Sequence, residues 1–206
     1  MADISWKRNR LRHVTTVAFC GIMLGGGLST RIAASEWDQK TIVTFNTPVE
    51  VPGKDLPPGT YVFKRLDSPT DRAIVQIFDK DEKRLYATIL AIPDYRLKPT
   101  GKPVIRFEER PSDSPPALKA WFYPGEEDGL QFVYTHDRAT DLAKRTKQNV
   151  LSMRNEMEGT MTAPASSPDA PNVKALEITV VTAVTPSGEQ VGMDQAASTT
   201  AKNPKK

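Results

Sequence analysis

Residues 73–92, Ala73-Ile-Val-Gln-Ile-Phe-Asp-Lys-Asp-Glu-Lys-Arg-Leu-Tyr-Ala-Thr-Ile-Leu-Ala-Ile92, decide the fold of this 206-residue chain. Two apolar runs, Ala73–Phe78 and Leu85–Ile92, flank the polar segment Asp79–Lys83, a pattern typical of an antiparallel β-hairpin. Both runs carry apolar side chains on both alternating faces, and a strand buried on both faces lies in the middle of a sheet. We therefore predict that this hairpin forms the centre of a β domain.

Five further short apolar runs surround the hairpin, and segments rich in Pro, Gly and Asp separate them. The runs are Thr41–Phe45, Thr60–Leu66, Val104–Glu108, Leu118–Tyr123 and Leu130–Tyr134. Seven short strands with turn signals between them indicate an all-β domain. The fold class predicted is mainly β, as a single antiparallel β-sandwich or small barrel.

The period of the apolar residues changes after Tyr134. Ala139, Leu142 and Ala143 share one helical face, which predicts a short helix over about 138–147. Asp137 is the expected N-cap of this helix. We interpret Asn149–Met153 as extended, so the predicted β domain spans residues 38–153.

The remaining residues, 154–206, are expected to form a largely disordered tail. From Pro164 onward they are rich in Ala, Ser, Thr, Pro and Lys, and the chain has no aromatic residue after Tyr134. Such a composition buries too little apolar surface to offset the entropy of the chain. One β-branched island, residues 176–185, is a possible strand if a sheet edge accepts it. Lys202, Lys205 and Lys206 are interpreted as a solvated end.

Residues 1–35 have the pattern of a secretory signal peptide. Basic residues between Lys7 and Arg12 precede the apolar run Val14–Leu24, and the small residues Ala33-Ala34-Ser35 follow. The apolar run is shorter than the roughly 20 residues that span a bilayer. We expect export to the periplasm or the medium and no transmembrane span in the mature chain.

Charge and cysteine content exclude several function classes. The segment before Glu36 has five cationic residues and one anionic residue, while the remainder has 23 cationic and 24 anionic residues and a net charge of −1. Nucleic-acid binding requires a concentrated basic surface, so no nucleic acid is expected. The sole cysteine, Cys20, lies in the leader. We predict no cofactor, no metal site and no catalytic residue.

The core resembles a family of secreted bacterial proteins of the acidobacterial type, for which no activity is known. The resemblance covers about residues 44–153. It is carried by Val51-Pro-Gly53, Leu56-Pro-Pro-Gly-Thr-Tyr-Val-Phe-Lys64, Ile74-Val-Gln-Ile-Phe78, Leu85-Tyr-Ala-Thr-Ile-Leu-Ala-Ile-Pro-Asp-Tyr-Arg96, Phe107-Glu-Glu-Arg-Pro111, Ala117-Leu-Lys-Ala-Trp-Phe-Tyr-Pro-Gly125 and Phe132-Val-Tyr134. The resemblance implies an exported, mostly β module and does not indicate any activity.

Two aromatic positions are candidates for ligand binding. Trp121 and Tyr123 lie two residues apart on one strand, so their rings would stand on the same face. Exposed, they would stack against a sugar or a partner protein; buried, they would belong to the core. The loop residues Tyr95 and Arg96 are the second choice, for binding an anion or stacking a ligand, or else for covering the edge of the core.

Two other motifs are interpreted as structural. Glu108 and Glu109 could suggest glycosidase carboxylates, but adjacent residues on a strand point to opposite faces. His136-Asp137 contains the only histidine outside the leader and has no nucleophile motif beside it. We interpret His136 as a surface residue at the start of the helix.

The sequence favours an exported, non-enzymatic β module that binds a ligand or supports the cell envelope. Its partner is unknown, with an envelope polysaccharide or a protein as possibilities. The alternatives are a carbohydrate-binding module that uses Trp121 and Tyr123, and an exported hydrolase with carboxylate chemistry. An exposed Trp121–Tyr123 face would favour the module, and three or more acidic residues that converge in one cleft would favour the hydrolase.

Overall fold

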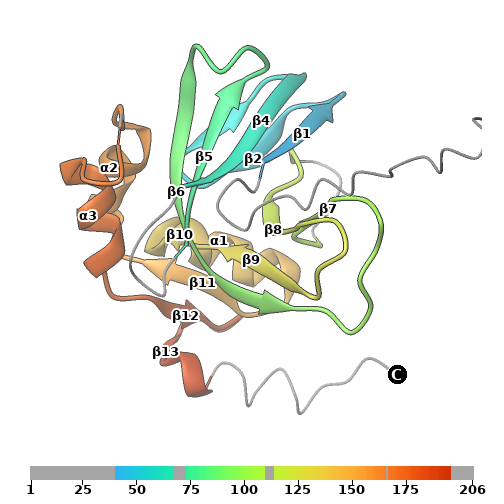
Figure 1. The fold of residues 1–206 in the computed structure, drawn as a ribbon. Helices are drawn as coiled ribbons and strands as arrows, with labels where there is room; N and C mark the ends of the chain where they lie inside the picture. Colours follow the sequence, from blue (N-terminus) through green and yellow to red (C-terminus); the bar gives the residue numbers. More distant parts are fainter. Residues whose placement is uncertain (1–39, 67–72, 110–113, 166, 196–206) are drawn as a thin grey trace, which may run out of the picture. The chain divides into compact units, whose positions relative to one another are not determined.

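The computed structural model describes residues 40–66, 73–109, 114–165 and 167–195. The predicted signal peptide and the last 11 residues, 196–206, lie outside these ranges. The fold is mainly β, as the sequence predicts, and combines one large antiparallel sheet with a few short helices (Figure 1). In the described part of the chain, no helix is long and apolar enough to cross a membrane.

The large sheet has seven strands in the order β1-β4-β5-β6-β9-β8-β7. Their bounds are β1 Lys40–Phe45, β4 Gly59–Leu66, β5 Ala73–Asp79, β6 Leu85–Tyr95, β7 Val104–Phe107, β8 Leu118–Phe122 and β9 Asp128–Phe132. The predicted hairpin is confirmed, since β5 and β6 pair antiparallel near the middle of the sheet. A separate two-stranded hairpin joins β2 (Val49–Val51) to β3 (Lys54–Leu56).

The sheet curls into a half-barrel, and the aromatic side chains fill its concave face. Phe45 on one edge strand and Phe107 on the other have ring centroids 6.2 Å apart, so the two edges of the sheet approach each other. Between them lie Tyr61 and Phe63 of β4 and Trp121 of β8, with Phe63 and Trp121 6.1 Å apart. This concave cluster is the main core of the protein.

The opposite face of β5 and β6 is covered by the carboxyl-terminal segment. Ile74 and Leu90 point to this face and pack against α2 (Glu158–Thr162) and α3 (Pro171–Ile178). Gln76 of β5 donates a hydrogen bond from Nε2 to the Ala165 carbonyl, 3.1 Å away. The expectation of a largely disordered segment from 154 is therefore wrong for its described part. Met157, Met161, Val173 and Leu176 are buried there.

The predicted strand over 176–185 is only partly correct. Residues up to Ile178 belong to α3, which starts with Pro171 at a position where a missing N–H costs little. Only β12 (Thr182–Val184) is a strand, and it pairs with β11 (Val150–Met153) in a second sheet of order β10-β11-β12-β13. The outer members are β10 (Tyr134–Thr135) and β13 (Gln190–Val191). The boundary at residue 153 therefore divides one packed unit.

The predicted helix is present as α1 (His136–Thr146), and the face formed by Ala139, Leu142 and Ala143 is buried as expected. The predicted cap is wrong. Thr135 occupies the N-cap position, and the Asp137 N–H donates to the Asn155 side-chain oxygen at 2.9 Å. Asn155 begins the 3₁₀ turn η2 (Asn155–Met157), so the segment after β11 supplies the acceptor for the start of α1.

Candidate functional site

Trp121 and Tyr123 do not form an exposed stacking platform. Trp121 is 2% exposed and packs between Phe63 and Tyr123, while Tyr123 is half-buried at the end of β8. Lys119, whose charge suggests contact with water, instead pairs with the buried Glu108 at 3.2 Å. The flat face required for stacking along a sugar chain is therefore absent.

Both rings instead line a small cleft at the end of the β8–β9 hairpin, here named the β8–β9 cleft. Its volume is about 40 Å³, and its lining residues are Arg65, Trp121, Tyr123, Glu126, Asp128, Gly129 and Leu130. Arg65 comes from β4, where it continues the concave row of Tyr61 and Phe63. The curl of the sheet thus brings a cation from β4 to the carboxylates of the hairpin.

Three of the residues that line this cleft carry a polar group without a hydrogen-bond or ion-pair partner among the described residues. The Nε1–H of Trp121 is buried and makes no hydrogen bond. The Arg65 guanidinium and the Asp128 carboxylate form no ion pair or hydrogen bond in the described ranges. A buried donor without an acceptor costs about 1–3 kcal/mol, so this arrangement is a candidate for completion by a ligand.

The second predicted pair, Tyr95 and Arg96, supports the cleft from the outside. Arg96 is 5% exposed and donates to two carbonyl groups of the β8–β9 turn, Glu126 O at 2.8 Å from Nε and Tyr123 O at 3.1 Å from Nη2. Its guanidinium also lies 5.0 Å from the centre of the Phe122 ring. Arg96 is thus a positioning residue for Tyr123 and Glu126, since its donors are used within the fold.

Tyr95 is the exposed member of the pair. Its hydroxyl donates to Glu127 at 2.6 Å, and this hydrogen bond raises the pKa of Tyr95 above its ordinary value. The Tyr95 backbone N–H donates to the Asp94 carboxylate at 2.8 Å. Tyr95 therefore ties the strand β6 to the β8–β9 turn.

Gly129 fixes the packing of the hairpin that forms the cleft. It lies opposite Phe122 in the β8–β9 register, and a Cβ atom at this position would be 2.3 Å from the Phe122 ring. Any larger residue would displace the ring, which also lies under the guanidinium groups of Arg96 and Arg106. Asp128, the residue before Gly129, is exposed and lines the cleft.

The structure separates the other candidate carboxylate and histidine motifs from this cleft. Glu108 is buried beside Lys119, and Lys119 also donates to Gln148 at 3.0 Å, so that carboxylate is used in a structural ion pair. His136 is half-buried, and its Nδ1 lies 3.5 Å from the Ser152 hydroxyl. Ser152 is fully buried, so this pair does not present an accessible nucleophile.

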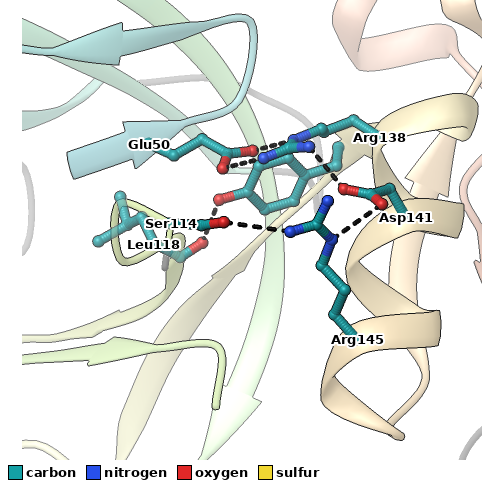
Figure 2. Close-up of polar contacts among 7 residues, drawn as sticks. Glu50, Ser114, Leu118, Arg138, Asp141 and Arg145 are labelled. Atoms are coloured by element: carbon teal, nitrogen blue, oxygen red, sulfur yellow. Dashed lines mark hydrogen bonds and ion pairs between the residues drawn. The ribbon is translucent and has the colours of Figure 1, made fainter. Parts of the chain in front are cut away.

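A charged network between β2 and α1 is a further structural element (Figure 2). Arg138 donates from two nitrogens to the buried Glu50 carboxylate and from a third to Asp141 at 2.7 Å. Arg145 donates to the same Asp141 at 3.0 Å and to the Ser114 hydroxyl at 3.1 Å. The Glu50 carboxylate raises the pKa of Arg138. Because these charges satisfy one another, the network fastens α1 to β2.

Sequence reasoning missed Arg65, Glu126 and Asp128 as cleft residues. The one available signal was Arg65, a charge that continues the alternating positions of Tyr61 and Phe63 at the end of an apolar strand. Within the ranges described, no group of three His, Cys, Asp or Glu side chains could hold a metal ion. No family model, no curated protein and no solved structure matches this chain.

Proposed function

We propose that this protein is an exported, non-enzymatic binding module that recognises an acidic sugar group in the β8–β9 cleft. The observation that carries the proposal is that Arg65, which has no ion pair or hydrogen bond within the described ranges, lines a cleft together with Trp121, whose buried Nε1–H also has no hydrogen-bond partner there. The resemblance of the core to secreted acidobacterial-type proteins supports the same class of exported module.

The chemistry of the cleft favours a ligand with a carboxylate and hydroxyl groups. The Arg65 guanidinium carries several N–H groups that can donate hydrogen bonds, and a guanidinium binds a carboxylate strongly because both partners are charged. Asp128 at the rim accepts hydrogen bonds from hydroxyl groups, and the Tyr123 ring offers an apolar side. A uronic acid combines these two kinds of group on one ring.

The size of the cleft favours recognition of part of a larger molecule. A volume of about 40 Å³ is far below the roughly 300–1,000 Å³ of pockets that enclose whole small molecules. It admits a single functional group such as a carboxylate, while the rest of the sugar lies outside. We therefore propose a terminal or branching uronate of an envelope polysaccharide as the target.

A binding role is favoured over hydrolysis by the placement of the carboxylates. The Glu108 carboxylate is used in its ion pair with Lys119, and its neighbour Glu109 also has an interaction within the fold. Glu126 and Asp128 share the cleft, so hydrolysis is an outcome that the experiment must be able to detect. If the protein released new reducing ends from an acidic polysaccharide, it would be a hydrolase and not a binding module.

The experiment compares glucuronate with glucose, which differ in the carboxylate alone. We expect glucuronate to shift the Trp121 indole N–H resonance saturably and glucose to shift it weakly. Arg65→Gln should weaken glucuronate binding at least tenfold, while Lys80→Gln, at an exposed lysine of the distant Asp79–Lys83 loop, should not. An unmoved indole resonance at millimolar glucuronate would refute the proposal.

Export is tested separately. The order of basic, apolar and small residues in 1–35 supports cleavage after Ala34 or Ser35. Amino-terminal sequencing of protein from the producing cell should therefore begin at Ser35 or Glu36. Recovery of cytoplasmic protein that still carries the intact leader would contradict the prediction of export.

A further inference from the structure

A second cleft lies on the small four-stranded sheet, on elements other than those of the β8–β9 cleft. Its volume is about 270 Å³, and it is lined by His136, Met153, Arg154, Val180 and Gln190. These residues come from the start of α1, the end of β11, the segment before β12, and β13. Here it is named the β11 cleft.

One wall of the β11 cleft is apolar and partly open to water. Val180 is 66% exposed, although it is a β-branched apolar residue between a helix and a strand. Met153 forms the buried part of the wall, and methionine adapts its shape to varied apolar ligands. An apolar surface of this kind beside a cavity is a place where an aliphatic group of a ligand gains free energy by leaving water.

The polar residues of the β11 cleft are one cation, Arg154, and two neutral side chains that can both donate and accept hydrogen bonds, His136 and Gln190. The Arg154 guanidinium is exposed and has no ion pair or hydrogen bond within the described part of the chain. The His136 Nδ1 lies 3.5 Å from the Ser152 hydroxyl, and the Gln190 Nε2 donates to the Thr182 hydroxyl at 2.8 Å. No acidic side chain is among the lining residues.

From this combination we infer that the β11 cleft binds a small aliphatic carboxylate. Arg154 would bind the carboxylate through parallel N–H groups, with His136 beside it, while the hydrocarbon chain would lie against Met153 and Val180. The volume lies just below the range of about 300–1,000 Å³ for ligand pockets, which favours a short chain over a long one. The inference is independent of the sugar site, since the two clefts share no residue.

The test titrates the purified protein with octanoate and follows the backbone amide resonances. We expect saturable shifts at Met153, Val180 and Gln190 and none at Trp121. Octanol, which keeps the chain and lacks the charge, should bind at least tenfold more weakly. Acetate, which keeps the charge and lacks the chain, should also bind at least tenfold more weakly.

Two variants assign the binding to named side chains. Arg154→Gln removes the cation at an exposed position and should weaken octanoate binding at least tenfold, with Lys80→Gln as the control for an equal loss of surface charge. Val180→Ser shortens the apolar wall and should weaken octanoate binding while leaving acetate binding unchanged. Equal affinity of the parent and Arg154→Gln for octanoate, or no saturable shift at the β11 cleft, would overturn the inference.

Discussion

The indole of Trp121 allows a direct test of whether the β8–β9 cleft is built for a ligand at the expense of stability. Trp121→Phe removes the buried Nε1–H, which has no partner in the described structure. Relief of an unsatisfied buried donor is worth about 1–3 kcal/mol. Against this, a ring smaller by about 40 Å³ leaves a cavity that costs about 1 kcal/mol. We therefore expect an unfolding free energy between unchanged and about 2 kcal/mol higher.

Two control variants separate the effect of the N–H from that of the ring. Tyr134→Phe also removes one buried polar hydrogen, but the Tyr134 hydroxyl donates to the Leu118 carbonyl at 2.7 Å. Losing that satisfied bond should cost about 1–3 kcal/mol. Trp121→Ala empties the site and should cost about 3–5 kcal/mol.

The assay is urea unfolding followed by far-ultraviolet circular dichroism, because Trp6 and Trp37 also contribute to fluorescence in the full chain. The reasoning is refuted if Trp121→Phe destabilises the protein as much as Tyr134→Phe does. In that case the indole N–H is not a net cost to the fold. The same variant should lose glucuronate binding, so a stable variant that still binds normally would contradict the proposed role of Trp121 as a donor.

Three other predictions follow from the packing. Gly129→Ala should cost about 1–3 kcal/mol, because its Cβ would meet the Phe122 ring at 2.3 Å, while Gly101→Ala, which meets no atom within 4 Å, should be tolerated in the same urea assay. A chain ending at Arg154 should lose its cooperative unfolding transition, because the outer face of β5 and β6 would lie bare; a truncated protein that unfolds like the parent would contradict this. Burial raises the pKa of Tyr61, with a further contribution from the neighbouring Tyr86. Its contribution to stability should therefore be complete below about pH 10 and be lost as the pH rises through the folded pKa. Tyr61→Phe should reduce this loss of unfolding free energy at alkaline pH. An unchanged dependence of the unfolding free energy on pH would contradict the prediction.

The strands of the large sheet could be predicted from the sequence because their signals are local. A polar segment between two apolar runs predicts the β5–β6 hairpin, and the spacing of Ala139, Leu142 and Ala143 predicts α1. Each signal lies within one element and depends on the periodicity of that element. The predicted positions consequently agree closely with the structure.

The sequence predicts that a segment packs on the outer face of the central β5–β6 hairpin, but it does not predict which segment does so. Apolar residues on both faces of β5 and β6 require something to cover the outer face, but they do not say which segment does so. The covering residues lie in a stretch whose average composition is that of a disordered tail. Met157 and Met161 are one helical turn apart, as are Val173 and Leu176, and this spacing is a weak signal in such short helices.

The candidate site depends on the tertiary structure. Trp121 and Tyr123 are neighbours in sequence, yet their exposure depended on whether the sheet remains open or curls. The curl buries Trp121 against Phe63 and brings Arg65 to the β8–β9 hairpin, which lies far away along the chain. Periodicity determines which face of a strand a side chain occupies, whereas the curvature of the whole sheet determines what that face meets. The sequence alone thus determined the strands and the central hairpin, and only the tertiary structure decided which charged groups surround the indole.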